Sequence, residues 1–144
     1  MSDMRRLMNI VTEAVVREGA GSETLYHVTL QENVPIIMEQ GLMPQDGQPV
    51  FLSTDISDAV RRYADPNHKG YGPHVVLAVR LADLDPTHLG PDLDDLWELY
   101  AEEDWPHEDR EPDDMTWQES LQMCSQCSYN SIIPPAAIRV ARTV

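Results

Sequence analysis

The chain has 144 residues, enough for one domain, and the 42% that are apolar supply one packed core and exclude a wholly disordered chain. The net charge of −15 at pH 7 repels phosphate backbones and anionic membranes, so a nucleic-acid or membrane partner is disfavoured. No stretch approaches the roughly 18 apolar residues of a membrane span. Two cysteines, Cys124 and Cys127, cannot form a disulfide framework, so we expect a cytoplasmic protein.

Hydropathy patterns predict elements of both kinds along a single domain over residues 1–144. Apolar residues at helical spacing indicate an N-terminal helix over about 3–18. A β-prone run over 24–29 indicates a strand, and 31–40 indicates a helix that ends at Gly41. Later in the chain the patterns predict a strand over 50–54, a helix over 57–64, a strand over 74–81, one or two strands within 117–133, and a last strand over 138–144. This order favours an α+β fold built on antiparallel or mixed sheets.

Acidic residues concentrate between Asp92 and Asp114, which predicts an insertion between core elements. This segment contains twelve of the 25 acidic residues and only one of the ten basic ones, Arg110. Helical spacing of its apolar residues predicts a short helix over 92–103 with one apolar face, formed by Leu93, Leu96, Trp97 and Tyr100. Two interpretations stay open. The segment is either a solvated helix and loop held by its aromatic residues, or a surface that binds a partner or mimics a nucleic acid.

Three short motifs contain residue types that can do chemistry. His27 lies inside a predicted strand, Ser53 lies where a strand passes into a helix, and Ser128 begins a run that ends at Pro134-Pro135. Taken alone, each has a structural explanation: a satisfied histidine, a helix N-cap formed by Ser53 or Thr54, and a strand closed by a turn. The Cys124-x-x-Cys127 pair lacks two further ligands at suitable spacing, so we expect buried or half-buried thiols and no metal.

Together the motifs are more specific than any one of them. Leu25-Tyr26-His27-x-Thr29, Gly41-Leu42, Val50-Phe51-Leu52-Ser53 and Ile133-Pro134-Pro135-x-x-Ile138 follow one another in this order. The pattern resembles the ADP-ribosyltransferase superfamily, in particular its small bacterial and phage members and the related RNA 2′-phosphotransferase branch. The resemblance covers roughly residues 25–138.

The resemblance implies a split pair of small sheets with NAD in the cleft between them. His27 would contact a ribose hydroxyl of the adenosine half, and the main chain of Val28, next to Thr29, would hold the nicotinamide carboxamide. Ser53 would lie near the nicotinamide ribose. Tyr63 would stack on the nicotinamide ring, a suitable role because a cationic ring favours an aromatic face. Arg62 is a further candidate NAD-binding residue, and His27 together with Arg61 or Arg62 would suit the phosphate that an RNA 2′-phosphotransferase must hold.

The reaction that the resemblance implies breaks the bond between nicotinamide and ribose through an oxocarbenium-like transition state, which a carboxylate normally stabilises. In the family this acid comes shortly before the Pro-Pro turn, and the corresponding position here falls near Ser125 or Gln126. Gln126 can hydrogen-bond a ribose hydroxyl but cannot offset a full positive charge. Glu119 is the nearest acid in the sequence, and His27, Gln126 and Glu119 are the candidate catalytic residues.

Three functions remain open from the sequence. The first is an NAD-dependent mono-ADP-ribosyltransferase that modifies a protein acceptor, and a basic acceptor would suit the acidic chain. The second is a catalytically inactive module that binds NAD, ADP-ribose or a protein. The third is an RNA 2′-phosphotransferase, which the net negative charge opposes.

Overall fold

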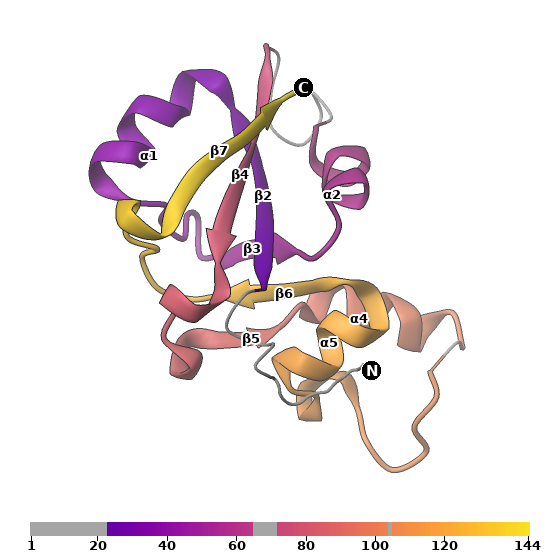
Figure 1. Ribbon diagram of the computed structural model, residues 1–144. Coiled ribbons are helices and arrows are strands. Elements are labelled where there is room, and N and C mark those ends of the chain that lie inside the picture. The colour runs from indigo at the N-terminus through magenta and orange to yellow at the C-terminus, as the bar shows by residue number, and fades with distance from the viewer. Residues whose placement is uncertain (1–22, 65–71, 104) are drawn as a thin grey trace.

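One six-stranded antiparallel sheet organises the residues that the computed structural model describes, which are 23–64, 72–103 and 105–144. The strands lie side by side in the order β5-β6-β3-β2-β4-β7 (Figure 1). Their bounds are β2 (Thr24–Leu30), β3 (Val50–Ser53), β4 (His74–Arg80), β5 (Leu89–Pro91), β6 (Gln126–Tyr129) and β7 (Ile138–Thr143). The α+β prediction is therefore confirmed, and the predicted N-terminal helix over about 3–18 lies outside the described residues.

The sheet consists of two halves that meet at a single residue pair. β2 pairs with β4 along its whole length, from Thr24↔Arg80 to Leu30↔His74, and β4 pairs with β7. On the other side β3 pairs with β6, and β6 with β5. Between the halves, β2 and β3 pair only at Tyr26↔Ser53. Figure 1 shows the result: β2, β4 and β7 run upright while β3, β6 and β5 cross below them.

Helices pack on both faces of the sheet. The α-helices among the described residues are α1 (Val34–Gln40), α2 (Ile56–Tyr63), α4 (Leu93–Ala101) and α5 (Trp117–Cys124). Short 3-10 turns are η2 (Gln31–Asn33), η3 (Leu81–Asp83), η4 (Pro86–His88), η5 (Pro112–Asp114) and η6 (Pro135–Ala137). The main core lies on the face of Leu25 and Leu77, where α1 and α5 contribute side chains. α2 packs on the opposite face of β2, against Val28.

The strands and helices predicted between residues 23 and 90, and the last strand, are found within two residues of their expected bounds, except that the helix predicted over 31–40 is η2 followed by α1. The helix over 31–40 ends at Gly41, as predicted, because φ there is +96° and a Cβ atom would lie 2.6 Å from the carbonyl oxygen of Ile133. The prediction for 117–133 is partly wrong. Its first half is the helix α5, which a capping box of Thr116 and Glu119 begins, and only β6 is a strand.

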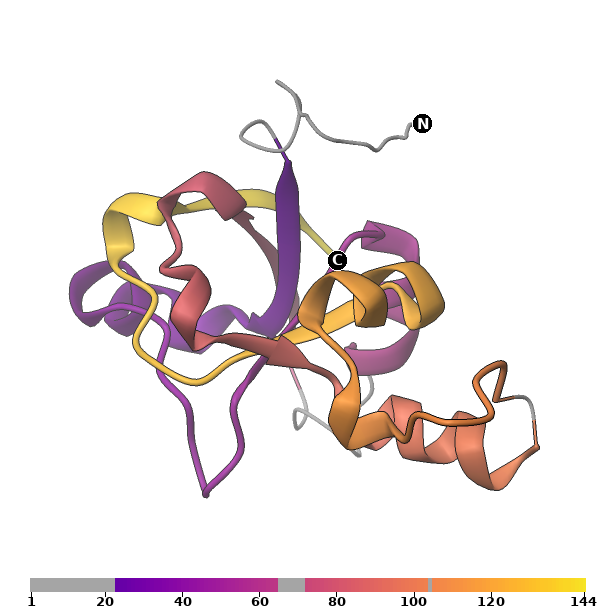
Figure 2. The ribbon, with the colours of Figure 1, turned by 90° about the horizontal axis from the view of Figure 1, so that it is seen from below.

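The acidic insertion contains the predicted helix, α4, but only one residue of its apolar face is in the core. Leu96 is fully buried, whereas the side chains of Leu93, Trp97 and Tyr100 remain about 40% exposed. In Figures 1 and 2, α4 lies at the opposite side of the molecule from α1. Among the described helices, none has the length and apolar character that crossing a membrane requires.

Candidate functional site

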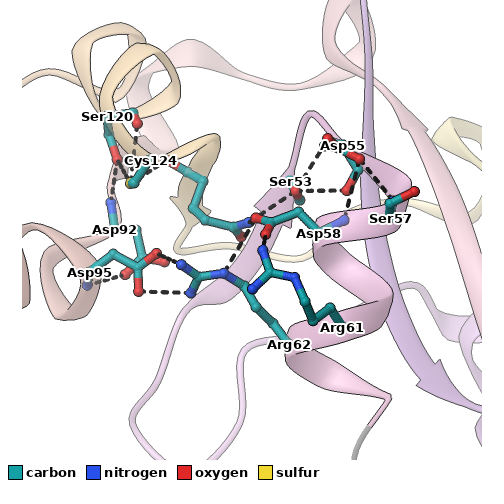
Figure 3. A network of polar contacts seen from close by, with 11 residues as sticks. Ser53, Asp55, Ser57, Asp58, Arg61, Arg62, Asp92, Asp95, Ser120 and Cys124 are labelled. Carbon is teal, nitrogen blue, oxygen red and sulfur yellow. Dashed lines mark hydrogen bonds and ion pairs between the residues drawn. The ribbon is translucent and has the colours of Figure 1, made fainter.

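A cleft of about 500 Å³ opens between the start of α2, one face of α4 and the end of α5. Its walls are mainly charged, and many of their side chains appear in Figure 3. The lining residues are Asp55, Ser57, Asp58, Arg61, Arg62, Asp95, Glu98, Leu99, Glu102, Met123, Cys124 and Ser125. Carboxylates outnumber the two arginines, so the electrostatic field of the cleft favours a cationic group.

Asp55 sets the direction of α2 and thereby the position of the cleft wall. Its carboxylate caps the helix by accepting hydrogen bonds from the main-chain N–H groups of Ser57, at 2.8 Å, and Asp58, at 3.3 Å. The expectation that Ser53 or Thr54 caps this helix is therefore wrong. The hydroxyl of Ser53 instead lies beside the main chain of Asp55, and it is turned toward β6.

Ser53 and Gln126, which are 73 residues apart in the sequence, meet beneath the cleft wall. The Nε2 of Gln126 donates to the Oγ of Ser53 at 2.9 Å and to the Oδ2 of Asp58 at 3.1 Å. Because a carboxylate only accepts hydrogen bonds, Asp58 fixes which end of the amide faces it. The other end, Oε1 of Gln126, is buried and has no hydrogen-bond partner among the described residues. Neither Ser53 nor Gln126 lines the cleft, so a hydroxyl or amide donor from the cleft would reach this acceptor only if the wall between them moved.

Arg62 links the two helices that form the cleft. Its guanidinium binds the carboxylate of Asp95 through two contacts of 2.9 and 2.8 Å, and its Nε lies 3.3 Å from Asp58 (Figure 3). Burial lowers the pKa of Arg62, but the hydrogen bond and charge of Asp95 and the charge of Asp58 outweigh burial, so the net shift is upward. Arg62 is therefore permanently charged and already committed to two carboxylates. Arg61 contacts Asp58 as well.

Asp92 is a buried carboxylate at the start of α4. It is 2% exposed, and its Oδ1 accepts a hydrogen bond from the N–H of Asp95 at 3.1 Å. Burial raises the pKa of Asp92 to about 6. Its own N–H donates to the hydroxyl of Ser120, which in turn donates to the carbonyl of Gln126 at 2.6 Å. These bonds connect α4, α5 and β6 behind the cleft.

The thiols match the prediction of a buried or half-buried pair. Cys127 is buried in the core, and Cys124 is half-buried with its Sγ donating to the carbonyl of Ser120. Burial raises the pKa of both thiols, that of Cys127 to about 12, so neither is a nucleophile near neutral pH. Within residues 23–64, 72–103 and 105–144, no group of three or more potential ligands is arranged to hold a metal ion.

The remaining predicted NAD-binding residues lie around β2 and not in the cleft lining. The Nδ1 of His27 is 2.8 Å from the carbonyl oxygen of Phe51, beside the single pair that joins the two halves of the sheet. Val28 is buried in the core under α2, where Tyr63 packs against the same cluster. Side-chain alternation puts His27 and Thr29 on the other face of β2. The structure thus brings together Ser53 and Gln126, and Asp58 connects Gln126 to Arg62, whereas His27 is not among the residues that line the cleft.

Glu119, the alternative catalytic acid, lies in the first turn of α5 outside the cleft lining. Both of its oxygens accept hydrogen bonds from Arg110, at 2.7 and 2.8 Å, and Oε1 also accepts from the N–H of Thr116. The hydrogen bonds from Arg110 are the main reason that the pKa of Glu119 is lowered to about 2.

We expect the Glu119→Gln substitution to lower the free energy of unfolding by about 0.5–1 kcal/mol, because it removes the ion pair and weakens the capping box. Since the pKa of Glu119 is lower in the folded chain, its contribution is present above the ordinary value of 4.5 and is lost as the pH falls toward 2. Urea titrations at neutral pH and below pH 3 measure this difference. An equal effect of the substitution at both pH values would contradict it.

Asp58 and Asp95 are site residues that the sequence interpretation missed. Asp58 and Arg62 are four residues apart, a spacing that predicts an ion pair on one helix. Nothing local indicates Asp95, which is 33 residues from its partner Arg62.

No protein-family model matches the chain, and a search of the curated proteins finds no match either.

Proposed function

We propose that the protein is a cytoplasmic, NAD-dependent mono-ADP-ribosyltransferase that modifies a protein acceptor. The observation that carries the proposal is the contact of Gln126 with Ser53 and Asp58 beside the cleft. Ser53 belongs to one motif of the family resemblance, and the position at which that resemblance expects the catalytic acid falls near Ser125 or Gln126. The single-pair junction between the two halves of the sheet supports the split arrangement that the resemblance implies.

Asp58 supplies the negative charge that Gln126 lacks. Its Oδ2 is 3.1 Å from the Gln126 amide, so a positive charge that develops on a ribose bound to Gln126 would lie near this carboxylate. Asp95, Glu98 and Glu102 extend the negative field along the cleft. An acidic cleft also suits a basic acceptor side chain.

In this proposal NAD enters the cleft with its nicotinamide riboside half, whose cationic ring suits the acidic lining. The Oε1 of Gln126 is buried behind that lining, so a ribose hydroxyl would reach this acceptor only after side chains of the cleft wall move aside. The diphosphate does not suit the acidic lining, because the cleft arginines are paired with Asp58 and Asp95. It would therefore lie outside the lining, toward β2. There His27 would hold the adenosine ribose. Val28, Thr29 and Tyr63, which the resemblance assigns to the nicotinamide, would contact that ring where the cleft meets β2.

A second candidate is the inactive binding module. It is favoured by one specific observation: Asp58 contacts both Arg61 and Arg62, so part of its charge is neutralised. The acidic lining and the paired arginines count against the RNA 2′-phosphotransferase, whose substrate carries phosphates.

The decisive experiment compares the wild-type protein with the Gln126→Glu variant in the presence of labelled NAD and cell lysate. We expect the variant to transfer or hydrolyse at least about tenfold faster, because a full carboxylate stabilises the oxocarbenium-like transition state better than an amide. The new carboxylate would be buried beside Asp58, so the variant should also be less stable than the wild type.

Gln122→Glu is a matched control, because it makes the same change at an exposed position of α5 just ahead of the cleft. It should leave turnover at the wild-type rate. If both proteins bind NAD but neither consumes it, the binding module replaces the transferase. If neither binds NAD, both candidates are wrong.

A further inference from the structure

One face of α4 presents large apolar side chains to solvent. This face is formed by Leu93, Trp97 and Tyr100, which are spaced as i, i+4 and i+7. We call these three residues the aromatic stripe, after the two rings that dominate it. They are 40%, 39% and 42% exposed, although the adjacent Leu96 is fully buried. Exposed aromatic side chains gathered on one helix face are typical of interaction surfaces.

The rings of the stripe are held in place by their neighbours. Trp97 and Tyr100 meet edge to face at 5.2 Å between ring centroids, and Tyr100 meets Trp105 in the same way at 5.9 Å. The indole N–H of Trp97 donates to the Oδ1 of Asp113 at 2.9 Å. The polar edge of Trp97 is thus satisfied within the chain, and a partner would bind rings whose orientation is already fixed.

Charge decides which partner suits the aromatic stripe. Exposed carboxylates lie beside it: Asp94 follows Leu93 on α4, Glu103 comes just after the helix, and Asp113 contacts Trp97. A second copy of the chain, with its own net charge of −15, would be repelled, and so would a nucleic acid or an anionic membrane. A guanidinium group can stack on an exposed ring while it binds a neighbouring carboxylate, which makes arginine the matching side chain.

We propose that the aromatic stripe of α4 binds an arginine-rich segment of a partner protein. The binding mode requires the rings as well as the negative field, and it does not depend on the transferase activity. Lysine-rich segments feel the same field but stack less well on the rings. The aromatic stripe should therefore bind an arginine-rich segment more tightly than a lysine-rich segment of the same net charge.

The test titrates the full-length protein with fluorescein-labelled octa-arginine and octa-lysine at low ionic strength and follows anisotropy. We expect octa-arginine to bind more tightly, and binding to weaken with added salt. Trp97→Leu/Tyr100→Leu should weaken octa-arginine binding by about tenfold, as the loss of stacking at two rings implies. Ile36→Ala, which removes an exposed apolar side chain on α1, is the control and should bind as the wild type does.

A second pair of variants keeps the test valid if the double leucine variant does not fold. Asp94→Asn/Glu103→Gln removes two charges beside the stripe, and Glu32→Gln/Glu39→Gln removes two exposed charges from η2 and α1. We expect the first pair to weaken octa-arginine binding more than the second. Equal effects of the two pairs, equal affinity for both peptides, or unchanged affinity of a folded leucine variant would each overturn the proposal.

Discussion

Replacing Arg62 with methionine is expected to lower the free energy of unfolding by about 2 kcal/mol at neutral pH. The substitution keeps most of the side-chain volume but leaves Asp95, whose side chain is 12% exposed, without its partner. Breaking a fully buried ion pair costs about 3–5 kcal/mol, and the partial exposure of Arg62 reduces that figure. We expect this loss of stability to be among the largest for the substitution of one partly exposed side chain, because the Arg62 guanidinium also contacts Asp58.

A double-mutant cycle separates the ion pair from a general effect of losing charge. If Arg62 acts mainly through Asp95, then Arg62→Met in an Asp95→Asn background should cost clearly less than it does in the wild type. Arg139→Met, at an exposed position of β7, is the control and should change stability by no more than about 0.5 kcal/mol. Urea denaturation of the four proteins of the cycle and the control gives the comparison. If the effects of Arg62→Met and Asp95→Asn on the free energy of unfolding are additive, the interaction energy between the two side chains is zero.

Most of the fold was predicted from patterns that are complete within one short segment of the sequence. Short runs of β-prone residues identified β2, β3 and β4, and helical spacing together with a terminal glycine identified α1. β5 was missed because Leu89–Pro91 is three residues long and contains a glycine and a proline, so only its pairing with β6 makes it a strand. The helix α5 was missed within 117–133, where one or two strands were predicted, although Thr116 and Glu119 have the spacing of a capping box, a signal that was present in the sequence.

The candidate site was predictable only in part, for the same reason. The family resemblance pointed to Ser53 and Gln126, and these two side chains are in contact. The pairing of Arg62 with Asp95 joins α2 to α4 across 33 residues of sequence, and no local pattern encodes it. Arg62 was expected to hold a phosphate, and in the structure its guanidinium instead binds Asp95. The side chain of His27 lies at the junction of the two half-sheets, outside the cleft lining, and its role toward NAD remains a prediction.

Asp92→Asn should make the protein more stable at neutral pH, by about 1–3 kcal/mol. Asparagine keeps the side-chain oxygen that accepts the hydrogen bond from the N–H of Asp95, so the cap of α4 survives. What the substitution removes is a buried negative charge close to Asp95 and Asp94. The gap between an ordinary pKa of 3.8 and the folded value of about 6 sets an upper limit of about 3 kcal/mol.

The sign of the pH dependence follows from that gap. Because the pKa of Asp92 is higher in the folded chain than in the unfolded one, the folded chain holds the proton more tightly between about pH 4 and pH 6. The wild type therefore loses stability as the pH rises through this range, whereas the asparagine variant does not. The advantage of the variant should be full above pH 7 and vanish below about pH 3.5. Asp94→Asn, at the exposed neighbouring position, should show no such dependence, and a stability gain of Asp92→Asn that is the same at both ends of the range would contradict the burial of an ionised Asp92.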